Sequence, residues 1–314
     1  MKIPDKRIIE ETALLIKPYI NHTPVLTSQS LNELYQTELY FKCENFQKAG
    51  VFKSRGACNA LFSLTEEQLQ KGVATHSSGN HAAALARAAK LRNTKAYVVM
   101  PENSSKVKVE AVKTYGGSIM FCKPTLEARE TTLKEVISKT GAIEIHPYDN
   151  YQIIAGQATS AKELIEEIPG LDYIICPVGG GGLLSGTLLA AHYFAPDTKV
   201  IAAEPENAGD AYLSFKTKKF VPSVNPDTIA DGLRTSLGDL TFPIILEHLH
   251  DIYTVSEKDI IDSMILIWER MKIIVETSSA VTLAVVKNNA GLFNGKKTGI
   301  IISGGNVDLK NLPW

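Results

Sequence analysis

Four consecutive glycines occupy positions 179–182, between the apolar run DYIICPV and the helix-like run LLSGTLLAAHYF. A strand, a glycine loop and a helix start bring backbone N–H groups and the positive end of the helix dipole to one point. This arrangement is typical of phosphate binding. A tight turn is the competing interpretation, but each added glycine raises the entropic cost of ordering the backbone. The loop therefore predicts a phosphate site.

The spacing around the loop excludes the common nucleotide motifs. A P-loop carries Lys-Ser or Lys-Thr after its last glycine, and neither pair follows here. A dinucleotide fingerprint needs a third glycine where Leu184 or Ser185 stands. Glu204 does end the next predicted strand about 20 residues on, where a ribose-binding acid is expected. An NAD-dependent oxidoreductase and a non-catalytic nucleotide-binding module therefore remain as remote alternatives.

Two further segments carry polar groups at predicted loop-to-helix junctions. Lys53 lies in CENFQKAGVFKSRGACNA, although a lone lysine is usually a solvated surface charge. The segment SSGNH at 77–81 opens onto the helix-like run HAAALARAAK, whose free N–H groups suit a carboxylate. Ordinary turn and capping chemistry explains SSGN equally well.

The elements that must position these residues alternate between strands and helices. From 72 to 149, the runs GVATHSS, KAYVVM and SIMFCK alternate with three helix-like runs. A second alternation extends from IAGQATSAKELIEEI to KTGIIISGG, and TELYFKCE and SRGACNALFSL are expected to pack with it. Parallel strands need crossover connections, so this alternation predicts parallel sheets covered by helices. We predict an α/β fold with a large domain, 1–71 plus 150–314, and a small domain, 72–149, inserted in it.

Composition limits the possible partners. The 314 residues are 44% hydrophobic, which is enough for a large core. The 33 Lys and Arg nearly balance the 34 Asp and Glu without a run of like charge, which argues against nucleic acid. No 18 apolar residues follow one another, so neither a membrane span nor a signal peptide is expected. The four cysteines form no C-x-x-C pair and fit a reduced, cytoplasmic protein.

Together the motifs resemble the pyridoxal-phosphate enzymes of fold type II, the tryptophan-synthase-β-like family. The resemblance rests on the lysine segment, SSGNH, VGGGGL and IISGGNVDL, in that order along the chain. It also covers HPYDN, AAEPENAGD and TIADGLRTSLG, and looks closest to the serine/threonine dehydratase and serine racemase branch. It implies two parallel-sheet α/β domains with the cofactor, pyridoxal 5′-phosphate, in the cleft between them.

The resemblance also implies the cofactor contacts. Lys53 would form a Schiff base with the cofactor aldehyde, Asn80 would bond its 3′ oxygen, and Ser303 would meet its ring nitrogen. A neutral hydroxyl does not hold a proton on that nitrogen as a carboxylate would, which favours elimination or racemisation over transamination. Without the resemblance, Ser303 would be a turn residue at a strand end. The implied cofactor-binding residues are Lys53, Phe52, Asn80, Gly179, Gly180, Gly181, Gly182, Leu183 and Ser303.

Catalysis and substrate binding follow from the same resemblance. Lys53 would abstract the α-proton, and Ser78 would be the second catalytic residue, on the opposite face of the cofactor. Arg129 is a weaker candidate for binding a substrate carboxylate, and we interpret His81 mainly as structural. The implied substrate contacts are Ser77, Ser78, Gly79, Asn80, His81, Arg129 and Ser236.

The segment AAEPENAGD resembles the family's divalent-cation site, with Glu204, the Ala208 carbonyl and Asp210 as ligands. Hard oxygen donors suit Mg²⁺ or Ca²⁺. A solvated acidic loop is the alternative, since carboxylates are usually exposed. The failed glycine spacing favours the metal over the ribose interpretation of Glu204.

The expected activity is a lyase reaction on L-serine or L-threonine that gives a 2-oxo acid and ammonia. Tyr148 favours a dehydratase, because many dehydratases carry an aromatic residue there. Serine racemase, alone or combined with elimination, and 3-hydroxyaspartate ammonia-lyase are the alternatives. Val51 and Thr277 depart from the family pattern, where Ser or Ala and Pro are common. We expect a homodimer that binds a small amino acid and neither nucleic acid nor membrane.

Overall fold

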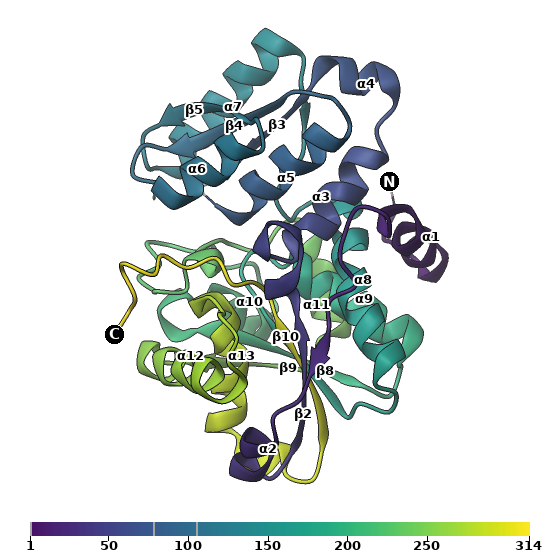
Figure 1. The fold of residues 1–314 in the computed structure, drawn as a ribbon, viewed down its shortest axis with the longest axis vertical. Helices are drawn as coiled ribbons and strands as arrows, with labels where there is room; N and C mark the ends of the chain where they lie inside the picture. Colours follow the sequence, from purple (N-terminus) through teal and green to yellow (C-terminus); the bar gives the residue numbers. More distant parts are fainter. Residues whose placement is uncertain (1, 78, 105) are drawn as a thin grey trace.

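The computed structural model describes residues 2–77, 79–104 and 106–314, and it contains two β-sheets (Figure 1). The larger sheet has the order β1-β2-β10-β7-β8-β9, and all its pairs are parallel except β1 with β2. Its strands are β1 (Val25–Leu26), β2 (Glu38–Cys43), β7 (Tyr173–Pro177), β8 (Lys199–Pro205), β9 (Asp251–Val255) and β10 (Lys297–Ile302). The predicted strands TELYFKCE, DYIICPV, KVIAAEP and KTGIIISGG are confirmed as members of this sheet.

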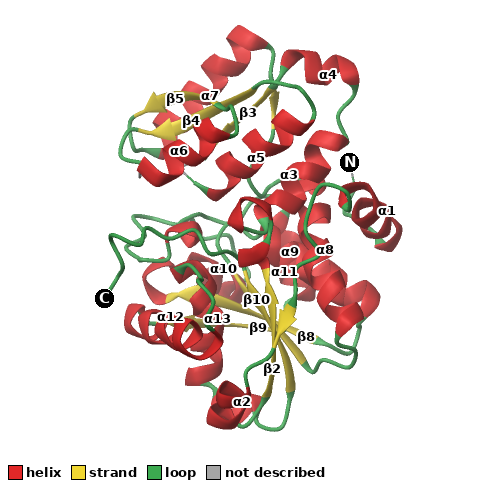
Figure 2. Ribbon diagram, viewed as in Figure 1, coloured by secondary structure: helices red, strands yellow, loops and turns green. Residues whose placement is uncertain are grey.

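Helices cover both faces of the larger sheet (Figure 2). Ile175 and Ile300 pack on one face, whereas Ile174 and Ile301 pack on the other, because successive strand side chains point to opposite faces. Both faces are buried, which explains the nearly continuous apolar strands. The first face packs against α12 (Glu257–Met271) and α13 (Thr277–Asn288), and the second against α8 (Tyr151–Glu167), α9 (Gly182–Phe194) and α11 (Thr241–His248). The remaining helices near this sheet are α1 (Lys6–Ile16), α2 (Gln29–Tyr35), α10 (Asp210–Thr217) and α14 (Ala290–Phe293).

The smaller sheet has the order β5-β4-β3-β6 and is parallel throughout. Its strands are β3 (Val73–His76), β4 (Ala96–Pro101), β5 (Ser118–Cys122) and β6 (Ile143–Glu144). Its helices are α5 (Asn80–Leu91), α6 (Lys106–Thr114) and α7 (Leu126–Thr140), preceded in the chain by α3 (Lys53–Phe62) and α4 (Glu66–Lys71). The two sheets confirm the predicted parallel α/β fold, while the domain boundaries remain a prediction.

Helix α3 joins the two halves of the molecule. Its side chains Ala57, Cys58 and Leu61 pack in the apolar cluster of the smaller sheet, rather than only with the later half as the sequence suggested. On its other side α3 crosses α8 in backbone contact, since a Cβ on Gly156 would lie 2.5 Å from the Gly56 Cα. Helix α3, which begins with Lys53, therefore lies between the smaller sheet and helix α8 of the larger sheet.

Among the described residues, no helix combines the length and apolar character needed to cross a membrane.

Candidate active site

Lys53 lies at the first position of α3, beside the end of β10. The Phe52 N–H donates to the Ser303 carbonyl over 3.0 Å, and the Gly305 N–H donates to the Gly50 carbonyl over 3.0 Å. These bonds bring the predicted lysine and the predicted ring-nitrogen partner together, although 250 residues separate them in the chain. The Phe52 side chain packs against the core of the larger sheet.

The amine of Lys53 is desolvated. Burial lowers the pKa of Lys53 to about 8, although the charge of Glu276 opposes the shift. Its Nζ donates to the Pro147 carbonyl oxygen over 2.8 Å. A lysine that is partly neutral near neutral pH can act as a nucleophile and as a base.

The glycine loop follows β7 and starts α9. Gly181 has φ +88°, a conformation that favours glycine, and no side chain caps α9. A 13-residue helix with an uncapped N-terminus leaves N–H groups for an anion. The Leu183 side chain lies in the apolar core, so only its backbone can contact a phosphate there.

Close packing also explains the glycines. A Cβ on Gly180 would lie 2.3 Å from the ring of Tyr148, and one on Gly182 would lie 2.9 Å from the Tyr148 Cβ. A Cβ on Gly181 would approach Thr241 Oγ1 to 2.7 Å, and one on Gly179 the Leu233 Cα to 3.0 Å. The loop therefore needs bare backbone on both sides, a constraint that the sequence did not reveal.

Asn80 begins α5, and its side chain is hydrogen-bonded to residues near the larger sheet. Its Nδ2 donates to both carboxylate oxygens of Glu276, over 3.1 and 3.0 Å, and its Oδ1 accepts from Asn306 Nδ2 over 2.9 Å. Burial raises the pKa of Glu276 to about 7. The expected hydrogen bond from Asn80 to the cofactor remains a prediction. It would be made by a side-chain amide that already bonds to Glu276 and Asn306.

The other predicted substrate residues lie in several places. Ser77 Oγ accepts the Gly79 N–H over 3.4 Å, and a Cβ on Gly79 would lie 3.1 Å from the side chain of Lys108. Lys108 in turn forms an ion pair with Asp231, which connects α6 to the larger sheet's layer. Ser236 Oγ accepts the Ser223 N–H over 2.8 Å. The predicted catalytic residue Ser78 lies outside the described residues.

His81 and Arg129 differ in exposure. His81 is buried, its Nε2 lies 3.2 Å from the Ile145 carbonyl oxygen, and burial lowers its pKa well below the usual value. This agrees with a structural role. Arg129, on α7, is partly exposed. Burial lowers the pKa of His76, and the charge of Arg129 adds to this shift. Burial raises the pKa of Tyr148 to about 12, and the charge of Arg129 opposes this shift. Tyr148 and His146 stack edge to face, with ring centroids 4.6 Å apart.

The predicted cation ligands lie together after β8. The Glu204 carboxylate accepts the N–H groups of Ala211 and Tyr212 over 2.9 and 2.7 Å, and burial raises its pKa to about 8. Neither buried carboxylate oxygen of Asp210 accepts a well-formed hydrogen bond from a described residue, and burial raises the pKa of Asp210 to about 6 although nearby Ser223 lowers it. Buried, unpartnered carboxylate oxygens fit a hard cation. Among the described residues, no three His, Cys, Asp or Glu side chains lie close enough together to hold a metal ion, so the Ala208 carbonyl would be needed as a ligand.

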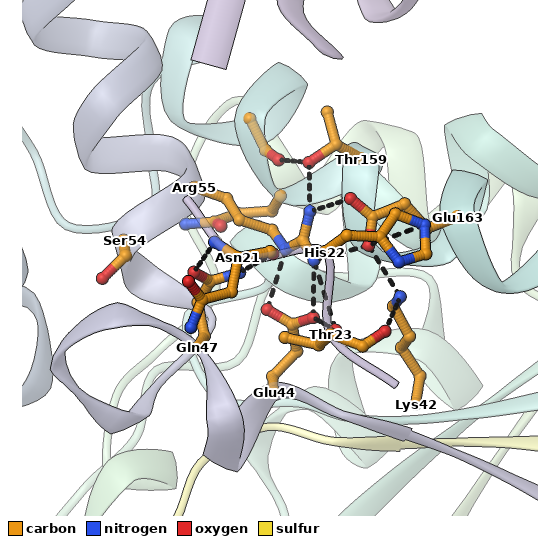
Figure 3. A network of polar contacts seen from close by, with 12 residues as sticks. Asn21, His22, Thr23, Lys42, Glu44, Gln47, Ser54, Arg55, Thr159 and Glu163 are labelled. Carbon is orange, nitrogen blue, oxygen red and sulfur yellow. Dashed lines mark hydrogen bonds and ion pairs between the residues drawn. The ribbon is translucent and has the colours of Figure 1, made fainter. Parts of the chain in front are cut away.

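A buried ion network anchors the start of α3 (Figure 3). The Arg55 guanidinium donates to both carboxylate oxygens of Glu44, each over 2.8 Å, and to those of Glu163 over 2.7 and 2.8 Å. Lys42 Nζ lies 2.6 Å from Glu163. The side chains of Arg55, Glu44 and Lys42 are fully buried. Two cations and two anions therefore balance at the junction of β2, α3 and α8.

Several of these polar residues were not predicted from the sequence. Glu44, Glu163 and Glu276 look like ordinary surface acids there. The one sequence feature that could have pointed to them is that Arg55 and Glu276 stand next to motifs shared with the family that the chain resembles.

Comparison with known proteins identifies the family. Residues 16–304 match the family described as pyridoxal-phosphate dependent enzyme. The chain is 54% identical over 312 residues to a serine racemase of Dictyostelium discoideum, covering 97% of this chain and 95% of the relative. It is 51% identical over 299 residues to a beta-hydroxyaspartate dehydratase of Paracoccus denitrificans, covering 95% of both. The crystal structure of the Dictyostelium racemase superimposes with a TM-score of 0.93 over 97% of this chain and 99% of that chain. This protein therefore belongs to the family of pyridoxal-phosphate dependent enzymes.

Proposed function

We propose that the protein is a lyase that converts 3-hydroxyaspartate to a 2-oxo acid and ammonia. The similarity to a beta-hydroxyaspartate dehydratase supports this substrate over L-serine and L-threonine, which the sequence analysis put first. The proposal rests on that similarity, and we propose Arg129, a partly exposed arginine of α7, as the group that binds the second carboxylate. An arginine suits a second carboxylate because its planar fork can bind both oxygens.

The residues of the site fit pyridoxal 5′-phosphate. The uncapped N-terminus of α9 and the glycine loop would hold the phosphate, and Ser303 would face the ring nitrogen. When bound, the cofactor supplies an electron sink for charge at the substrate Cα. Lys53, with its pKa near 8, would take the α-proton, and Arg129 would orient the distal carboxylate.

Arg129→Gln should raise KM for 3-hydroxyaspartate about 10- to 100-fold, because a charge-assisted bond to the distal carboxylate is lost. KM for L-serine, which lacks that carboxylate, should stay unchanged. Steady-state kinetics with both substrates test this. Arg92→Gln, in a surface ion pair with Glu66, is the control and should change neither value. An equal rise for both substrates would contradict the proposed role.

Serine racemase is the second candidate, and the 54% identity to a serine racemase favours it. Racemisation needs an acid–base group on each face of the cofactor, for which we propose Lys53 and Ser78. Measuring oxo acid and D-serine in the same incubation with L-serine separates the two activities.

We propose that Glu204, Ala208 and Asp210 bind Mg²⁺ or Ca²⁺. A cation would compensate two buried carboxylates, so chelation should lower the thermal midpoint, and either ion should restore it. The midpoint is measured by calorimetry and bound metal by elemental analysis. Asp210→Asn should abolish the response to the chelator. A midpoint that ignores the chelator, in protein without bound metal, argues against the site.

The predicted homodimer, cytoplasmic location and domain boundaries also stand as proposals, supported by the family resemblance and the two separate sheets.

A further inference from the structure

Asp149 holds the start of helix α11. Its Oδ1 accepts the N–H groups of Leu240 and Thr241 over 2.8 and 3.3 Å, and its Oδ2 accepts the Asp239 N–H over 3.1 Å. A carboxylate at this position satisfies N–H groups that have no partner within the helix, and it meets the positive end of the helix dipole. The packing is close, since a Cβ on Gly238 would lie 2.1 Å from Asp149 Oδ1. Asp149 therefore fixes where α11 begins.

Thr241, the first residue of α11, extends this contact to the glycine loop. Its side chain is fully buried. Its Oγ1 accepts the Gly238 N–H over 2.8 Å and lies 2.9 Å from the Gly180 carbonyl oxygen. A carbonyl oxygen can only accept, so the Thr241 hydroxyl donates to it. The Gly238 carbonyl oxygen, at 3.3 Å, is a more distant acceptor. The hydroxyl thus ties the start of α11 to the backbone of the glycine loop.

The bond to Gly180 also sets the direction of the next N–H group. The Gly180 C=O and the Gly181 N–H belong to one planar trans peptide, so they point in opposite directions. With the carbonyl directed at Thr241, the Gly181 N–H points away from Thr241, and no described residue accepts it. A peptide between two glycines rotates easily, because glycine adopts positive and negative φ at similar cost. The Thr241 hydroxyl opposes that rotation.

We propose that Asp149 is a positioning residue that, through Thr241, holds the Gly180–Gly181 peptide with its N–H toward the phosphate of the cofactor. The inference rests on the family cofactor and on the predicted phosphate site, and it is independent of the substrate. Tyr148, the neighbour of Asp149, packs directly against Gly180. Two consecutive residues therefore support the glycine loop, one by direct contact and one through α11.

The test is equilibrium dialysis of the holoenzyme against pyridoxal 5′-phosphate and, in parallel, against pyridoxal, which lacks the phosphate. Asp149→Ala should raise Kd for pyridoxal 5′-phosphate about five- to thirtyfold, the effect of about one or two hydrogen bonds. Kd for pyridoxal should stay unchanged. Thr241→Val should have the same selective effect. The two changes combined should cost no more than the larger single change, because both act through the Gly180 carbonyl.

A spectroscopic signal and a conservative variant make the test specific. The ³¹P NMR signal of the bound cofactor should shift in Asp149→Ala and in Thr241→Val. Thr241→Ser keeps the hydroxyl, so it should retain the wild-type signal and both Kd values. Asp172→Ala is the matched control. Asp172 also accepts a backbone N–H, that of Lys297 over 2.9 Å, but it lies at the opposite end of β7 from the glycine loop.

Each failure has a separate signature. Equal weakening of both ligands in Asp149→Ala would mean that Asp149 only stabilises the fold, and unchanged binding of both would also overturn the inference. If Asp149→Ala fails to fold, Asp149→Asn, which keeps one acceptor oxygen, should give a smaller loss confined to pyridoxal 5′-phosphate. Wild-type protein that binds both ligands equally would overturn the phosphate site together with the inference. Failure to convert 3-hydroxyaspartate would reject the proposed substrate without changing either Kd.

Discussion

Lys53→Ala should leave a folded protein without covalently attached cofactor and should reduce turnover by at least about 10³-fold. The lysine is expected both to bind the cofactor and to move the α-proton, and a positioned base alone contributes about 10²–10⁴-fold. Folding should survive because the amine is desolvated and donates only to the Pro147 carbonyl among the described residues. A buried lysine with a lowered pKa gives little stability to lose.

The measurement is borohydride reduction of the purified holoenzyme, followed by mass spectrometry of its peptides. Wild-type protein should carry the reduced cofactor on the peptide that contains Lys53, and the variant should carry none. Lys113→Ala is the control, since Lys113 pairs with Glu110 at the exposed surface. Reduced cofactor on a different lysine of the wild type would refute the assignment.

Arg55→Met should lower the free energy of unfolding by about 3–5 kcal/mol, because the change leaves the fully buried Glu44 and the partly buried Glu163 without their main cation. Met keeps much of the side-chain volume, so the loss reports the missing charge and hydrogen bonds rather than a large cavity. Denaturant unfolding followed by circular dichroism measures the difference. The slope of the transition should stay unchanged if the variant still folds in one step.

Two comparisons make this prediction specific. Arg7→Met removes an exposed partner of Glu11 and should cost less than about 1 kcal/mol. Arg55→Met combined with Glu44→Leu should recover part of the loss, since apolar pairs often replace buried ion pairs without penalty. If Arg55→Met is no more destabilising than Arg7→Met, the network does not hold α3 in place.

The pH dependence of the network has a definite sign. Burial alone would raise the pKa of Glu163, but its hydrogen bonds to Arg55 and Lys42 and their charges lower it overall. A lowered folded-state pKa stabilises the fold above the unfolded pKa, about 4.3, and this contribution is lost as the pH falls through the folded value. Acid should therefore weaken the contribution of Arg55 to stability.

Much of the fold was predictable because its signals are local. Apolar runs of strand length and alternating helix-like runs predicted the parallel sheets, and the glycine loop predicted a phosphate site, whereas Lys53 and Ser303 were named from the family resemblance. Three strands were missed because they give no clear periodic signal. β1 and β6 have two residues each, and β9, DIYTV, lies in a weakly patterned stretch.

By itself the sequence determined the family and the layered architecture, since both depend on residue type and short spacing, while the roles of Lys53 and Ser303 stay predictions. Only the tertiary structure decided which residues surround these groups and how deeply they are buried. It placed Tyr148 against Gly180 and brought Glu44 and Glu163 together around Arg55. These contacts join residues that are distant along the chain, and burial and pKa shifts arise only when packing excludes water and brings the partners within hydrogen-bond distance.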